Sequence, residues 1–124
     1  MKIYQSAEDY LESILILRER QGVVRSIDIV HELEFSKPSV SVAMKRLREN
    51  GYIEMSSDGY ITLLPPGEEI AQRIYRRHKL LTQFLTSLGV NADTAAADAC
   101  KIEHDLSDES FEKIQAYILK NMPE

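Results

Sequence analysis

The chain has 124 residues, and its 20 acidic side chains outnumber the 15 basic ones, which gives a net charge of −5 at pH 7 with neutral histidines. Proteins that coat nucleic acid without sequence preference are usually basic, so this charge argues against that class, but it does not exclude a DNA-binding protein with local positive charge. Hydrophobic residues make up 44% of the chain, which is enough for a core in one compact domain or two small lobes. The chain contains no run of about 18 apolar residues, so no membrane span is predicted.

Residues 1–20 lack the pattern of a secretory signal peptide, because they become acidic and amphipathic after the first few positions. The one cysteine of the chain cannot form an internal disulfide. Together these features predict a cytoplasmic protein in a reducing compartment, with no membrane association.

Three helices are expected in the first 50 residues. The first begins near Ser6 and carries an apolar stripe with helical spacing. The second spans residues 26–33 and, after a tight break, the third spans residues 36–48. Ser26 and Ser36 are the expected N-caps of these two helices. A short helix, a break and a further helix with a serine-rich first turn form the pattern of a helix-turn-helix.

Two short strands are expected directly after these helices. Residues 51–55 and 59–63 have strand-like composition, and Asp58-Gly59 between them is a strong signal for a hairpin turn. A β-hairpin that follows a helix-turn-helix is a wing. The sequence Leu-Pro-Pro-Gly at residues 64–67 then closes the wing and predicts a lobe boundary between residues 66 and 67.

The third helix has no acidic residue, although the protein as a whole is acidic. Hydroxyl and basic side chains fall on its outer face, where they are suited to base edges and phosphates, and the N–H groups of its first turn favour phosphate. The alternative is a three-helix bundle with a solvated basic face. The residues expected to contact DNA, with the wing tip, are Arg25, Ser36, Lys37, Pro38, Ser39, Ser41, Lys45 and Arg46.

The second half of the chain predicts a long helix over residues 68–88, a helix over 94–105 and a last helix over 108–121. The middle one carries a thiol, a carboxylate and an imidazole at positions i, i+3 and i+4, which lie on one helical face. Donors of these types suit a transition metal. The alternative is a solvated carboxylate and imidazole beside a small buried cysteine. The three residues are Cys100, Glu103 and His104.

Other candidate ligands stand apart in the sequence. Asp9 and Glu12 share a face of the first helix, although capping and simple exposure are their ordinary roles. His78 lies in a basic band of the long helix, where a lone histidine is more often solvated or capping than a ligand. From the residues alone, these alternatives stay open.

Four segments of the chain stand out in their order and spacing. They are Glu-Asp-Tyr-Leu-Glu at 8–12, Ser-Lys-Pro-Ser-Val-Ser at 36–41, Arg-His-Lys-Leu-Leu at 77–81 and Ile-Glu-His-Asp-Leu-Ser at 102–107. With these segments the chain resembles the metal-dependent repressors of the diphtheria toxin repressor and manganese transport regulator family. The resemblance implies a mainly α fold with a small β-hairpin wing. A winged helix-turn-helix DNA-binding domain at 1–66 would precede a helical metal-binding and dimerisation domain at 67–124.

The resemblance also implies a metal site where the first helix, the long helix and the Glu-His segment meet. Fe²⁺ or Mn²⁺ is the expected physiological metal, and Zn²⁺, Co²⁺ or Ni²⁺ would bind in vitro. The chain combines two patterns, because manganese-type relatives usually have a carboxylate in place of the cysteine and iron-type relatives usually have a thioether in place of the first aspartate. The implied ligands are Asp9, Glu12, His78, Cys100, Glu103 and His104.

The expected function is therefore metal-dependent DNA binding by a homodimer on a palindromic operator, as a repressor of metal-uptake genes. One alternative is a winged-helix regulator that senses an organic ligand without metal. Another is a small metal-dependent hydrolase, but the chain has no His-Glu-x-x-His motif and no evident pair of nucleophile and base. We therefore expect a regulator and not an enzyme.

Overall fold

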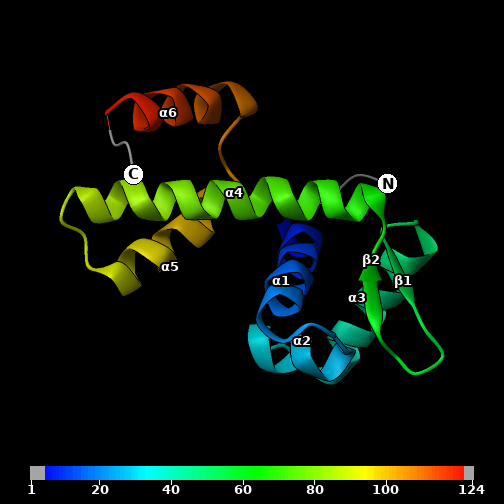
Figure 1. The fold of residues 1–124 in the computed structure, drawn as a ribbon. Coiled ribbons are helices and arrows are strands. Elements are labelled where there is room, and N and C mark those ends of the chain that lie inside the picture. Colours follow the sequence, from blue (N-terminus) through cyan, green and yellow to red (C-terminus); the bar gives the residue numbers. More distant parts are fainter. Residues whose placement is uncertain (1–4, 122–124) are drawn as a thin grey trace. The chain divides into compact units, whose positions relative to one another are not determined.

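The computed structural model describes residues 5–121, which contain six helices and one two-stranded antiparallel sheet (Figure 1). Contacts divide the chain into two units, of which one ends at Arg73 and the other begins at Ile74. The division falls inside the long helix α4 (Pro65–Ser87). The predicted functional boundary between residues 66 and 67 stays a prediction. No described helix has an apolar stretch long enough to cross a membrane.

The first unit is a helix-turn-helix with a hairpin wing, as predicted. Its core consists of apolar side chains from all three helices and from both strands, including Leu11, Ile29, Met44, Ile53 and Ile61. Its elements before α4 are α1 (Gln5–Gln21), α2 (Ser26–Leu33), α3 (Lys37–Glu49), β1 (Ile53–Met55) and β2 (Ile61–Leu63).

The caps of α2 and α3 set the break between them. Ser36 is the N-cap of α3, as predicted, and its hydroxyl oxygen accepts a hydrogen bond from the N–H of Ser39 at 3.2 Å. The prediction of Ser26 as the N-cap of α2 is wrong. Arg25 takes that place, because the Asp28 carboxylate accepts its main-chain N–H at 2.8 Å. Glu34 ends α2 in the left-handed conformation, with φ 57°.

The wing is held to the helices by main-chain hydrogen bonds. Ile53 pairs with Leu63 in the antiparallel ladder. Gly59 closes the turn with φ +85°, a conformation that glycine adopts without strain. The N–H of Ile61 donates to the carbonyl oxygen of Val24 at 2.8 Å, so the second strand is also bonded to the segment between α1 and α2.

Helix α4 begins at Pro65, three residues before the predicted start, so the Pro-Pro-Gly sequence is not a loop but the first turn of the helix. Proline is suited to this place, because the first N–H groups of a helix have no partner within it. Arg18 of α1 donates two hydrogen bonds to the Glu68 carboxylate, at 2.6 and 2.9 Å. This interaction holds the pKa of Glu68 below its ordinary value.

Gly67 is required by the close approach of α4 to the main chain before β1. A Cβ atom at this position would lie 2.2 Å from the carbonyl oxygen of Tyr52 and 3.3 Å from the Leu11 side chain. The same Tyr52 oxygen accepts a hydrogen bond from the N–H of Leu64 at 3.0 Å, so it cannot move away without loss of that bond.

The second unit contains the rest of α4 with α5 (Ala92–Ile102) and α6 (Asp108–Asn121), which lie on opposite sides of α4 in Figure 1. Asn91 caps α5, and Ser107 accepts a hydrogen bond from the N–H of Ser110 at the start of α6. The rings of Phe84 and Tyr117 meet edge to face, with centroids 6.2 Å apart. The buried apolar side chains include Leu81, Ala95, Ala99, Phe111 and Ile118.

The close contact at Gly67 predicts that alanine destabilises the protein at this position, although alanine has the higher helix propensity. Replacing glycine by alanine inside an open helix normally stabilises by about 0.5–1 kcal/mol. Here we expect Gly67→Ala to lower the free energy of unfolding by about 1–3 kcal/mol, because the added methyl group overpacks against main-chain atoms. Chemical denaturation of the whole chain measures this. Glu69→Ala, at an exposed position of the same helix, is the control. A Gly67→Ala chain as stable as this control would contradict the close approach.

Candidate metal centre and DNA-binding face

A buried carboxylate lies between two imidazoles in the second unit. Glu103 has no exposed surface. Its Oε2 lies 3.0 Å from Nδ1 of His78 on α4, and its Oε1 lies 3.4 Å from Nε2 of His104. The side chain of His104 is itself only 2% exposed. Three of the six predicted ligands therefore meet within this unit.

The surroundings of Glu103 fit a divalent cation. Burying a carboxylate costs several kcal/mol unless charges or hydrogen bonds compensate it. Within residues 5–121, Oε1 of Glu103 has no hydrogen-bond partner. Imidazole nitrogens and carboxylate oxygens are donors that bind Mn²⁺, Fe²⁺ and Zn²⁺. The donor set and the unsatisfied buried oxygen together suit such an ion.

The local backbone differs from the prediction. Helix α5 was expected to continue to residue 105, but it ends at Ile102, with Glu103 as its C-cap and His104 in a turn. The three predicted donors are therefore not all on one helix. Cys100 is exposed on α5, whereas Glu103 is buried. The role of Cys100 as a ligand stays a prediction.

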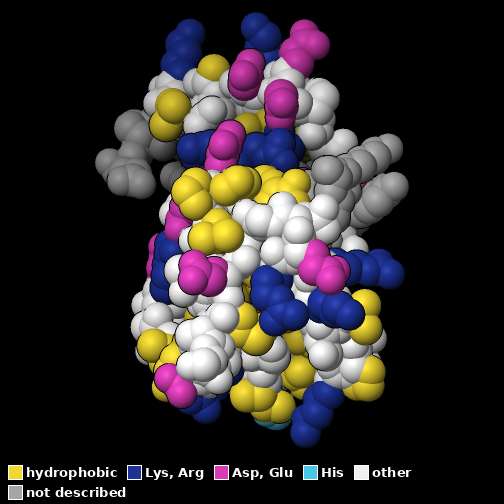
Figure 2. All heavy atoms as spheres, turned by 90° about the vertical axis from the view of Figure 1, so that its right-hand side faces the viewer, with side chains coloured by type: hydrophobic (Ala, Val, Ile, Leu, Met, Phe, Trp, Pro, Cys, Tyr) yellow, Lys and Arg dark blue, Asp and Glu magenta, His cyan; other side chains and the backbone are white. Residues whose placement is uncertain are grey.

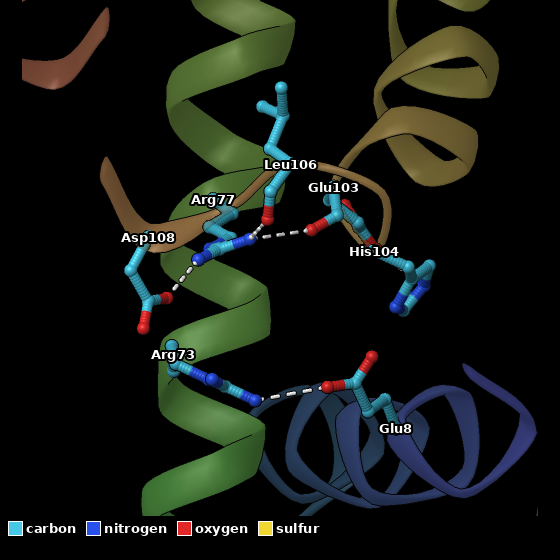
Figure 3. A network of polar contacts seen from close by, with 7 residues as sticks. All are labelled: Glu8, Arg73, Arg77, Glu103, His104, Leu106 and Asp108. Carbon is cyan, nitrogen blue, oxygen red and sulfur yellow. Dashed lines mark hydrogen bonds and ion pairs between the residues drawn. The ribbon is translucent and has the colours of Figure 1, made fainter. Parts of the chain in front are cut away.

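Helix α1 of the first unit carries the two other predicted ligands. One carboxylate oxygen of Asp9 and one of Glu12 lie within 4.8 Å of each other, and Glu12 is buried. Two carboxylates this close repel each other when both are charged. Burial raises the pKa of the neighbouring Tyr10, and the charge of Asp9 raises it further. Glu8 is used differently, because its Oε2 accepts a hydrogen bond from Arg73 at 3.0 Å (Figure 3).

The side chains predicted to contact DNA are exposed in the first unit. On α3 and its cap, these are Ser36, Lys37, Pro38, Ser39, Ser41, Lys45 and Arg46. The lower part of Figure 2, where the wing and α3 lie, shows Lys and Arg side chains next to hydrophobic ones. This surface is suited to phosphates through its cations and to bases through its hydroxyl groups.

Two residues of this face were missed from the sequence. The guanidinium group of Arg25, a predicted DNA contact, lies 4.4 Å from the ring centroid of Tyr60 in the wing, so the tyrosine helps to hold it. Val42 is 52% exposed in the middle of α3. It is an apolar group of the kind that contacts thymine methyl groups. Its place outside the apolar stripe of the helix was the available signal.

Two family models match consecutive parts of the chain. The one described as "Iron dependent repressor, N-terminal DNA binding domain" matches residues 2–61. The one described as "Iron dependent repressor, metal binding and dimerisation domain" matches residues 65–121. Between them they include every candidate site residue.

Curated relatives and solved structures agree with these matches. The chain is 38% identical over 109 residues to the HTH-type transcriptional regulator MntR of Geobacillus thermodenitrificans, covering 88% of this chain and 77% of that protein. It is 36% identical to an uncharacterized HTH-type transcriptional regulator of Methanocaldococcus jannaschii, covering 94% of each chain. A solved manganese-dependent transcriptional repressor in complex with manganese has a TM-score of 0.82 and 31% identity, over 90% of this chain and 52% of that one. The chain thus spans about half the length of that structure.

The buried carboxylate gives a prediction with two separate readouts. Glu103→Gln removes a buried charge and keeps the side-chain volume, so without metal this variant should be at least as stable as the wild type. At Mn²⁺ concentrations near 100 times Kd, the wild type should gain about 2.7 kcal/mol of stability and the variant almost none. Thermal unfolding with Mn²⁺ and with EDTA measures both effects.

The matched control is Glu109→Gln, because Glu109 is exposed at the start of α6. It should gain stability from Mn²⁺ as the wild type does. An equal gain for Glu103→Gln would show that Glu103 does not bind the metal.

Proposed function

Since the chain belongs to the iron-dependent repressor family, we propose that Fe²⁺ or Mn²⁺ raises its affinity for operator DNA. The curated relatives named above are transcriptional regulators, and the chain is accordingly a metal-dependent DNA-binding regulator and not an enzyme. The observation that carries the metal part of the proposal is the buried Glu103 carboxylate between His78 and His104. A regulator that senses an organic ligand would not need this arrangement and is not favoured.

The proposed ligands come from both domains. The domain limits are those predicted from the sequence, with residues 1–66 binding DNA and residues 67–124 binding metal and forming the dimer. Support comes from the close carboxylates on α1 and from the carboxylate between two imidazoles in the second unit. The thiolate of an exposed cysteine on α5 completes the set. The proposed ligands are Asp9, Glu12, His78, Cys100, Glu103 and His104.

The mechanism is a linkage between metal binding and DNA binding. Asp9 and Glu12 repel each other on α1, and Glu103 carries a further buried charge in the second unit. Asp9, Glu12 and Glu103 would hold a divalent cation, which would supply the positive charge that these carboxylates need. If the proposed ligands of both domains share that ion, metal would favour one arrangement of the recognition helices. DNA and metal would then each strengthen the binding of the other.

The proposed DNA target follows from two-fold symmetry. In a homodimer, each α3 would enter a major groove, and the two half-sites of a palindromic operator would lie about 34–36 Å apart or a multiple of this distance. The net charge of −5 makes affinity depend on the cations of this face. We place this activity in the cytoplasm, with metal-uptake genes as the repressed targets.

The proposal predicts metal-dependent DNA binding in vitro. A randomised duplex library selected with the Mn²⁺-loaded chain should yield palindromic sequences. On the selected duplex, Kd should be about 5–150-fold lower with Mn²⁺ or Fe²⁺ than with EDTA, which is the usual range of coupling between two sites. Gel-shift titration at fixed ionic strength, without oxygen for Fe²⁺, measures this ratio.

Arg46→Ala separates DNA contact from metal sensing. It removes a cation from the exposed side of α3, so it should weaken DNA binding with and without metal to a similar extent. Glu103→Gln should instead lose the dependence on metal. Equal affinity of the wild type in Mn²⁺ and in EDTA would contradict the proposed function.

A further inference from the structure

Arg77 is a buried cation that joins three points of one segment. The residue is only 5% exposed. Its Nη1 donates to the carbonyl oxygens of Glu103, at 3.1 Å, and of Leu106, at 2.8 Å, and its Nη2 donates to Asp108 Oδ1 at 2.6 Å (Figure 3). Its guanidinium carbon lies 4.9 Å from the ring centroid of Phe111. All of these groups belong to the second unit.

The two carbonyl groups are the ends of the turn that contains the proposed ligands. Glu103 begins the turn and Leu106 ends it, with His104 between them. Main-chain carbonyl groups past the end of a helix have no partner within it. Arg77 provides that partner here, directly after α5 ends at Ile102.

Arg77 directly precedes the proposed metal ligand His78 in the sequence. His78 follows it on α4 and contacts the Glu103 side chain at 3.0 Å. One turn of α4 therefore contacts Glu103 twice, with Arg77 at its main chain and His78 at its side chain. The position of the Glu103 carboxylate relative to the imidazole depends on both contacts.

The ion pair with Asp108 does not explain why this cation is buried. The Asp108 side chain is 76% exposed. An ion pair with so exposed a carboxylate contributes little, because water screens the carboxylate charge. A lysine ammonium has three donors on a single nitrogen, so it would reach fewer of these acceptors than the wide, planar fork of an arginine with its five donors. The carbonyl contacts are therefore the specific role of this side chain.

We propose that Arg77 is a positioning residue for the metal site, which sets the turn from Glu103 to Leu106 so that the Glu103 and His104 side chains are placed for metal. This rests on the ligand set proposed above. Arg77 does not bind the metal itself, because a guanidinium group has no acceptor atom. Residues that orient metal ligands in this way typically contribute 10–100-fold to metal affinity.

The test compares the metal affinity of folded variants of the whole chain. We expect Arg77→Lys to bind Mn²⁺ about 10–100-fold more weakly than the wild type in calorimetric titration. Arg76→Lys, at the adjacent exposed position of α4, should match the wild type. Asp108→Asn keeps both carbonyl contacts and should lose less than about fivefold, because the charge that it removes is on a 76% exposed side chain and is screened by water.

A further control separates positioning from general stability. Phe111→Leu removes the ring beside the guanidinium group and keeps the hydrogen bonds of Arg77, so it should lower the midpoint of thermal unfolding but not the Mn²⁺ affinity. The visible absorption spectrum of bound Co²⁺ gives a second readout, since it reports coordination geometry. It should change in Arg77→Lys and remain that of the wild type in Phe111→Leu.

Two results would overturn the proposal in distinguishable ways. If Arg77→Lys unfolds earlier but keeps the Mn²⁺ affinity and the Co²⁺ spectrum of the wild type, Arg77 is structural only. If the wild-type chain binds neither Mn²⁺ nor Co²⁺, the proposed ligand set is wrong, and Arg77 then has no metal site to position. Should Arg77→Lys not fold, a Phe111→Leu chain with weakened Mn²⁺ binding and an altered Co²⁺ spectrum would equally refute the role of the hydrogen bonds.

Discussion

The buried carboxylate of Glu103 needs positive charge close to it, and the structure of the candidate metal centre depends on this requirement. Glu103 has no contact with water, and its two oxygens face one imidazole each. A polypeptide that only needed stability would do better with an apolar residue at this position, because a buried charge is costly even when it is paired. Under the proposed function, a bound cation would make the arrangement favourable and would link metal occupancy to structure.

In the turn from Glu103 to Leu106, one set of side chains contacts the main chain and another contacts the Glu103 carboxylate. The cation of Arg77 is directed at carbonyl oxygens and at Asp108, while the imidazoles of His78 and His104 are directed at the Glu103 carboxylate. A guanidinium group that paired directly with this carboxylate would compete with a metal ion for it. Because Arg77 bonds to the backbone and to Asp108, the Glu103 carboxylate oxygens stay available to the proposed metal.

Local signals were sufficient to predict much of the fold. The serine cap of α3 and the Asp-Gly turn of the wing depend on neighbours within a few residues, and both lie where they were expected. Two predictions failed for different reasons. At the start of α2 a nearby group decides the cap, since Asp28 accepts the N–H of Arg25 and not that of Ser26. Past the end of α5 a distant group is involved, since the Glu103 carbonyl oxygen accepts a hydrogen bond from Arg77, 26 residues earlier, and the sequence near residue 105 contains no sign of it.

The candidate site was predicted by residue type, but not in its geometry. Spacing alone suggested that Cys100 and Glu103 share a face, yet the end of a helix changes how its last side chains point, and the two differ in exposure. His78 could not be assigned from its own surroundings, because its partner is 25 residues away. Only the resemblance to a family joined these positions, and the DNA-binding face still lacked Tyr60 and Val42.

A crystal structure of the Mn²⁺-loaded chain, with the ion located by its anomalous scattering, tests the central claim most directly. We expect an anomalous peak bonded to a Glu103 oxygen and to at least one imidazole of the second unit, with a carboxylate from α1 in the same coordination sphere. A peak without Glu103 among its ligands, or one that receives no ligand from α1, would contradict the claim that metal ties the DNA-binding domain to the dimerisation domain.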